Sequence, residues 1–133
     1  MIFSGSVLAC VPPLEGPRLE SQRFVVAFKP EAISVAKHFT VEIAACAKPG
    51  HPAPENLRVD ARMLEQRHGM NYAPEVKALG PGRWRAEGLM FHMPGKWEFV
   101  FELRAGGRTD RLAHPMLLSD FSPEEIRKIL AHG

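Results

Sequence analysis

The sequence predicts an all-β fold: an immunoglobulin-like antiparallel β-sandwich of about seven strands, with a short C-terminal helix. Three observations lead to this fold class. Apolar and polar residues alternate along several segments, which is the period of a half-buried strand. The 12 prolines and 11 glycines are spread between these segments, as the turns of an all-β protein require. With 133 residues, the chain has the size of one domain.

The clearest strands are four segments in which every second residue is apolar. Residues 57–63, "LRVDARM", would place apolar side chains on one face and charged side chains on the other. The other three clear segments are residues 23–29, 38–46 and 96–104. Weaker strands are expected at residues 75–79, 84–90 and 108–118. The aromatic residues expected to fill the core are Trp84, Trp97, Phe99 and Phe101.

Glycine and proline mark the turns between these strands. Pro94-Gly95 fits the two central positions of a type II turn, because proline presets φ and glycine accepts a positive φ. Residues 105–108, "AGGR", predict a hairpin that joins the last two strands. Both turns separate consecutive predicted strands.

The two ends of the chain differ from its centre. We expect residues 1–20 to be an N-terminal arm or the remnant of an export signal, residues 21–118 to be the sandwich domain, and residues 119–133 to be a C-terminal helix. Ser122, Pro123 and Glu125 have the N-cap, N1 and N3 positions of a capping box. A helix this short needs to dock on the sandwich or on a partner.

Composition and motifs exclude several classes of function. The net charge of +2, carried by scattered Lys and Arg residues, does not predict nucleic-acid binding. No apolar run reaches the ~18 residues that a transmembrane helix needs. The sequence has no G-x-S-x-G, P-loop or G-x-G-x-x-G motif, and its serines lack a histidine–carboxylate context. We therefore expect a protein that is not an enzyme and has no transmembrane segment.

The two cysteines, Cys10 and Cys46, leave several interpretations open. Their separation, without a C-x-x-C motif, argues against a zinc or thioredoxin-type site. If the protein is exported, they could form a disulfide. They could equally be two unrelated thiols, with Cys10 on a lipidated or removed terminus. The first ten residues fit the tail of a lipoprotein-type signal, an artificial boundary or an irregular arm.

Histidine and methionine residues are the candidates for binding chemistry. They occur together in three places: His68-Gly69-Met70, His92-Met93 and His114-Pro115-Met116. Imidazole and thioether ligands together favour Cu(I). Because loops of a sandwich cluster at its two ends, the first two groups could converge, and we predict a copper site formed by His68, Met70, His92 and Met93. The alternative is that the histidines are ordinary turn residues and the methionines fill gaps in the core.

Residues 57–103 resemble the YtkA-like family, which is related to FixH-like domains. The resemblance rests on three blocks in order: "HGMNYAP", "GPGRWRAEG" and "FHMPGKWEF". The typical family loop carries a proline and a second histidine, where this chain has Leu64 and either Gln66 or Arg67. This departure removes one candidate metal ligand. The resemblance implies a small exported β-sandwich associated with envelope proteins that handle metals or redox cofactors.

Together, these features predict a non-enzymatic accessory or binding module that is periplasmic or extracytoplasmic. Copper is the predicted cofactor, and Cys10 is a candidate site of lipidation. The alternative function is an interaction module that binds no metal and docks on a membrane protein or a di-haem peroxidase-like enzyme. The second partner is suggested by the tail "DFSPEEIRKILAHG", which resembles segments that lead into such peroxidases. The sequence does not determine the oligomeric state.

Overall fold

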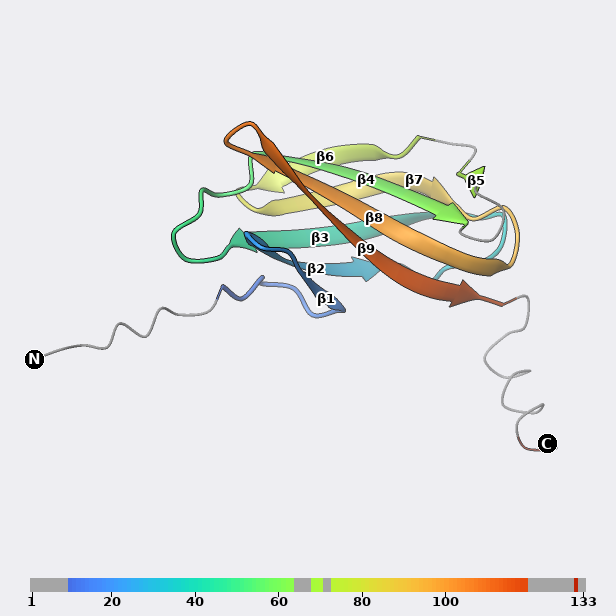
Figure 1. The fold of residues 1–133 in the computed structure, drawn as a ribbon. Coiled ribbons are helices and arrows are strands. Elements are labelled where there is room, and N and C mark those ends of the chain that lie inside the picture. The colour runs from blue at the N-terminus through green and yellow to red at the C-terminus, as the bar shows by residue number, and fades with distance from the viewer. Residues whose placement is uncertain (1–9, 64–67, 71–72, 120–130, 132–133) are drawn as a thin grey trace, which may run out of the picture.

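A computed structural model of the chain describes residues 10–63, 68–70, 73–119 and 131. Two antiparallel sheets pack face to face (Figure 1). The first sheet has the strand order β1-β2-β3-β7-β6, and the second has the order β5-β4-β8-β9. The strands are β1 (Arg18–Glu20), β2 (Phe24–Pro30), β3 (His38–Ala47), β4 (Asn56–Met63), β5 (His68–Gly69), β6 (Glu75–Gly80), β7 (Arg83–Met90), β8 (Gly95–Ala105) and β9 (Arg108–Leu118).

This architecture confirms the predicted β-sandwich and all seven predicted strands. Two short strands, β1 and β5, were not expected, and β1 consists of the last three residues of the predicted arm. The predicted C-terminal helix, residues 119–133, lies outside the described part of the chain except for Ser119 and Ala131. Within the described residues, no helix is long and apolar enough to cross a membrane.

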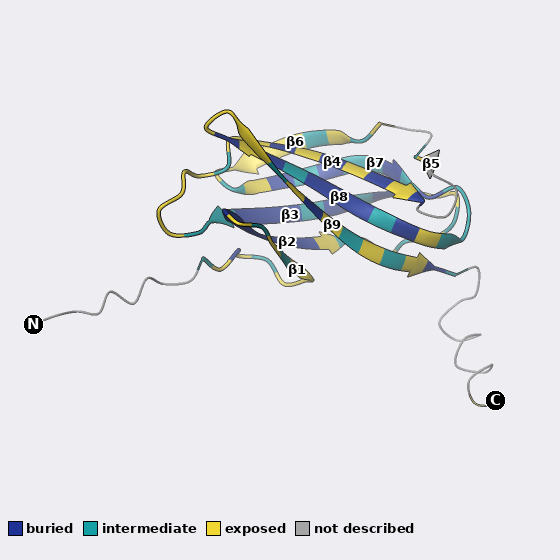
Figure 2. Cartoon of the chain, in the orientation of Figure 1, coloured by how far each residue is buried: buried dark blue, intermediate teal, exposed yellow. Residues whose placement is uncertain are grey.

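The core lies between the two sheets and follows the alternation seen in the sequence. Along β4, buried and exposed residues alternate without interruption (Figure 2). All four predicted core aromatics are buried, and Phe24, Phe28 and Phe91 join them. The tilted rings of Phe28 and Phe101, with centroids 5.0 Å apart, connect the two sheets near the centre. Burial of these large side chains is the main source of stability for the sandwich.

The two predicted turns differ in outcome. Gly106 and Gly107 form the tight turn between β8 and β9, both with positive φ, as the hairpin prediction requires. Gly95 instead has a φ of 143° and begins β8, which differs from the φ near +80° of a type II turn. The Cε atom of Met63 packs against Gly95, where a Cβ would collide with it.

A buried polar cluster connects the start of β2 to β9. The guanidinium of Arg23, 3% exposed, pairs with the carboxylate of Asp110, which also accepts a hydrogen bond of 2.6 Å from the Ser21 hydroxyl. Burial alone would raise the pKa of Asp110, but the hydrogen bonds from Ser21 and Arg23, and the charge of Arg23, outweigh this effect and lower it. The cluster therefore links the first sheet to the β8–β9 hairpin of the second.

Candidate metal-binding end of the sandwich

The five methionines that the structure describes all lie near one end of the sandwich. Backbone pairing brings them there: β3 begins at His38, which pairs with Met90 at the end of β7. In the second sheet, Met63 at the end of β4 pairs with Trp97, and Trp97 pairs with Met116 near the end of β9. We call this the Met–His end; it comprises His38, Met63, His68, Met70, Met90, His92, Met93 and Met116.

Trp97 is the centre of this end, and it positions His92 and Met93. Its indole ring is fully buried and stacks on Phe91, with centroids 4.4 Å apart and planes 10° apart. The His92 ring approaches the indole edge-on at 5.4 Å, and the indole N–H donates to the Met93 carbonyl over 3.0 Å. Both residues are half-buried. The loop between β7 and β8 is therefore fixed on an aromatic base while its side chains stay partly accessible.

The predicted partners of this loop, His68 and Met70, lie on a neighbouring segment. His68 belongs to β5 and pairs with Met63, which itself pairs with Trp97. Adjacent strands lie ~4.8 Å apart, so the His68 backbone is about 10 Å from that of Trp97. Met70 follows β5, is half-buried and packs against the core. Strand pairing thus places His68 at the same end of the molecule as the loop of His92 and Met93.

The environment of Met70 differs from that of the His92 loop. Met70 lines a hollow of about 390 Å³ between β4 and β6, together with Leu57, Val59 and Val76. Among the residues that the structure describes, no three His, Cys, Asp or Glu side chains gather as a metal site would need. An ion at the Met–His end would therefore depend on methionine sulfur as well as imidazole.

Met116 is a candidate that the sequence suggested only in part. It belongs to the third His/Met group, and the register places it opposite Trp97. It is half-buried and packs against the core beside the loop of His92 and Met93. His114 of the same group instead packs edge-on against Phe28, at 5.1 Å. Spacing along the chain could not reveal this difference, because it depends on which strands pair.

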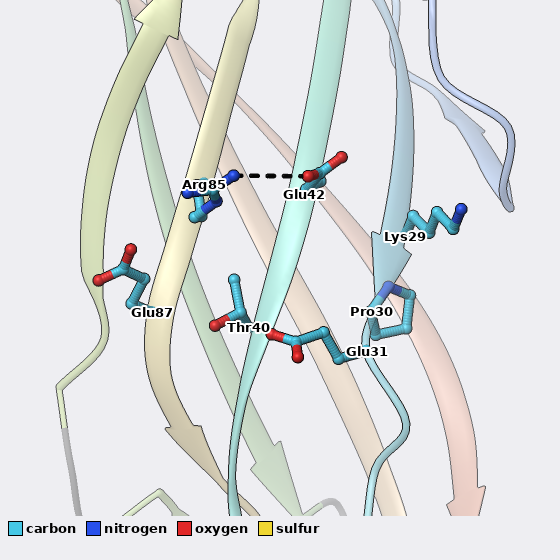
Figure 3. A pocket seen from close by; sticks show the side chains of 7 residues that line it. All are labelled: Lys29, Pro30, Glu31, Thr40, Glu42, Arg85 and Glu87. Carbon is cyan, nitrogen blue, oxygen red and sulfur yellow. Dashed lines mark ion pairs between the residues drawn. The ribbon is translucent and has the colours of Figure 1, made fainter.

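A hollow on the outer surface of the first sheet has a different character (Figure 3). It has a volume of about 400 Å³ and is lined by Lys29, Pro30, Glu31, Thr40, Glu42, Arg85 and Glu87. Arg85 pairs with Glu42 at 3.7 Å, and Lys77 beside the hollow pairs with Glu87 at 3.1 Å. The pairing with Glu87 raises the pKa of Lys77. Neutralised, exposed pairs of this kind are typical of a solvated sheet surface.

The cysteines form a Cys10–Cys46 disulfide with the Cα atoms 5.8 Å apart. The sequence left open whether the two cysteines form a disulfide or are unrelated thiols, and the structure contains the disulfide. A lipid thioether would use the same sulfur atom of Cys10, so disulfide formation and lipidation of Cys10 exclude each other. Cys46 is near the end of β3, whereas His38 begins that strand. The disulfide and the Met–His end therefore lie at opposite ends of β3.

Comparisons with known proteins identify the fold. No model of a protein family matches the chain, and no curated protein matches it. The YtkA-like resemblance therefore stays a prediction. Among solved structures, a DUF4426 family protein from Pseudomonas aeruginosa PAO1 has a TM-score of 0.53 at 9% identity, covering 80% of this chain and 99% of that protein. A DUF4785 family protein from Legionella pneumophila has a TM-score of 0.51 at 7% identity, covering 72% of this chain and 28% of that longer one. At these identities, the chain shares a fold with both proteins.

Proposed function

We propose that the protein is a non-enzymatic, extracytoplasmic β-sandwich module of the YtkA-like type that binds Cu(I) at its Met–His end. The observation that carries the proposal is the convergence of two sequence segments. His68 and Met70 follow β4, and His92 and Met93 follow β7, yet strand pairing brings both segments to one end of the sandwich.

The chemistry of this end suits a soft ion. Thioether sulfur and imidazole nitrogen are preferred ligands of Cu(I). Met93 and His92 are half-buried, so an ion could reach them, while Phe91 and Trp97 form an apolar base that would limit access of water. Met116, next to Trp97, is a further sulfur ligand within the same region.

The location and the absence of catalysis are also part of the proposal. A disulfide persists in an oxidising compartment, so Cys10–Cys46 is compatible with an exported protein. The two described groups with clearly shifted pKa values, Lys77 and Asp110, each take part in an ion pair on the surface or within the fold. Neither lies in the hollow of an active site, which favours a binding role.

Anaerobic titration with Cu(I) tests the copper site. Ascorbate should serve as the reductant in place of a thiol, so that the disulfide stays intact. In a Trp84→Phe background, the fluorescence of Trp97 reports binding, and a competing chelator gives the affinity. We expect one ion per chain, and an affinity at least about tenfold lower in a His92→Ala/Met93→Leu variant and in a His68→Ala/Met70→Leu variant.

Leucine in place of methionine keeps the packing while removing the sulfur. His51→Ala is the matched control, because His51 is exposed in the loop after β3, at the opposite end of that strand. The control should bind copper as the wild type does. If both double variants bind copper as strongly as the wild type and His51→Ala, the binding is adventitious and the proposal is refuted.

A metal-free interaction module is the alternative, and one observation favours it. Leu117, near the end of β9, is 71% exposed and lies two residues before the segment 119–133. An apolar side chain at this position could extend a docking surface formed by that segment. Affinity capture of a membrane or haem-enzyme partner by the full chain, and its loss on Leu117→Ser or on deletion of residues 119–133, would support this function. Retention of the partner by both variants would exclude it.

A further inference from the structure

The segment that precedes β1 is attached to the outer face of the first sheet. Cys10 is bonded to Cys46 on β3, and Pro12 is buried although it lies in no strand. Further along, the Phe28 amide donates to the Pro17 carbonyl over 3.2 Å. Gly16 passes so close to the Phe28 carbonyl that a Cβ at this position would collide with it. We call residues 10–17 the N-terminal strap.

The strap lies beside an apolar stripe that is separate from the main core. Phe24, Val26 and Phe28 of β2 face the core, so Val25 and Ala27 face the opposite side. Even so, Val25 is only 6% exposed, and Ala27 and its neighbour Ala44 on β3 are fully buried. Cys46 pairs directly with Val25, so the disulfide fixes the strap beside this stripe.

The two halves of the strap are held by different forces. The half nearest β1 has a backbone hydrogen bond through Pro17 and the close approach of Gly16. The other half, residues 10–15, is held by the disulfide and by the burial of Pro12. Loss of the covalent bond would leave this half with the buried ring of Pro12 and the half-buried Leu14, which is little compared with the entropy gained by several freed residues.

We propose that Cys10–Cys46 is a site of thiol–disulfide exchange whose reduction by a dithiol releases residues 10–15 and uncovers the stripe of Val25, Ala27 and Ala44. Both cysteines are half-exposed, so a thiolate can reach the bond. The attacking thiolate forms a mixed disulfide with one cysteine and displaces the other as a thiolate. The second thiol of the reductant then displaces the protein sulfur. The protein gains two electrons and two protons, and the dithiol becomes a disulfide.

The sandwich itself should survive this reaction. The stripe lies on the outer side of β2 and β3, whereas the aromatic core lies on their inner side. Cys46 pairs with Val25 of the stripe, so the disulfide is on the outer side as well. The reduced protein would therefore remain folded and present a new apolar surface. A surface of this kind fits an apolar segment of another chain.

Limited digestion with a glutamate-specific protease tests the proposal on the full chain. Glu15 lies in the strap and Glu55 lies in the loop before β4, and both are exposed. After complete reduction with dithiothreitol, verified by mass spectrometry of the alkylated thiols, we expect cleavage after Glu15 to be at least about tenfold faster and cleavage after Glu55 to be unchanged. A Cys10→Ser variant should behave like the reduced protein without any reductant.

Three results would overturn the proposal. Resistance of the disulfide to dithiothreitol under native conditions would mean that a thiolate cannot reach it. Unchanged cleavage after Glu15 in the fully reduced protein would mean that the strap stays in place without the bond. Equal acceleration after Glu15 and Glu55, with loss of the near-ultraviolet circular dichroism of the tryptophans, would mean that reduction unfolds the whole sandwich. None of these outcomes depends on copper binding.

Discussion

Arg23, which directly precedes β2, donates from Nε to Oδ1 of Asp110 on β9, over 2.9 Å. The same guanidinium donates to the carbonyl oxygens of Ala105 and Arg108, over 2.9 and 3.0 Å. One buried cation thus satisfies acceptors on both sides of the β8–β9 turn. A charge that is 3% exposed is tolerated only because these partners replace water around it.

Replacement of Arg23 by methionine should destabilise the protein strongly. The substitution leaves the Asp110 carboxylate and two carbonyl groups without their donor, and breaking a buried pair in this way costs about 3–5 kcal/mol. Urea denaturation followed by tryptophan fluorescence measures the loss. Arg62→Ala is the control: its pair with Glu98 has an arginine that is 47% exposed, so less than about 1 kcal/mol should be lost. Equal losses in the two variants would contradict this account.

The stability contributed by Asp110 should depend on pH. Its pKa is lower in the folded protein than in the unfolded chain, so the unfolded chain binds more protons in acid. The contribution is complete above the unfolded pKa of about 3.9 and disappears as the pH falls through the folded pKa. Urea midpoints of the wild type and of Asp110→Asn should therefore differ most above about pH 5 and converge in acid. A difference that is constant with pH would exclude this origin.

Two turn glycines allow a matched test of close backbone approach. Gly82 and Gly107 have similar positive φ values, 70° and 74°. A Cβ at Gly82 would lie 2.6 Å from the Ala45 carbonyl oxygen, whereas one at Gly107 would meet nothing within 4 Å. Both alanine variants carry the strain of a positive φ, about 1 kcal/mol. We expect Gly82→Ala to lose at least about 1 kcal/mol more than Gly107→Ala, as measured by thermal or urea denaturation.

The aromatic base of the Met–His end should be important for both stability and ligand binding. Phe91 is fully buried and contacts Trp97, Phe39 and Phe99. Phe91→Ala removes these contacts and should cost about 3–5 kcal/mol in urea denaturation. Phe91→Leu fills most of the cavity and should cost less. If the proposed copper site exists, the leucine variant should still fold but bind Cu(I) more weakly, because the loop of His92 and Met93 loses its stacked support.

The strands were predictable because alternation is a local property of the sequence. In β4, each apolar residue of "LRVDARM" faces the core, as the sequence indicated. The two-residue strand β5 was not predictable, because two residues carry no period. The outer residues of β2 were also misleading. Val25 and Ala27 are buried although they lie on the face opposite the core, and alternation along β2 does not predict this.

The sequence predicted which residue types could form the candidate sites, but not which of these residues lie close together. The sequence identified His92 and Met93 as potential ligands, but the row formed by Met63, Trp97 and Met116 depends on strand register, which spacing does not contain. The sequence also did not indicate that Arg23 is buried and paired. Its partner Asp110 is 87 residues away, and an arginine at the start of an apolar strand is usually exposed.

The position of Cys46 has a practical consequence for experiments on immobilised protein. From His38 to Cys46, β3 extends about 26 Å at ~3.3 Å per residue. The Cys10→Ser variant has a single thiol in its sequence. A maleimide surface attached to that thiol would hold the molecules with the Met–His end directed away from the support and toward the solution being tested.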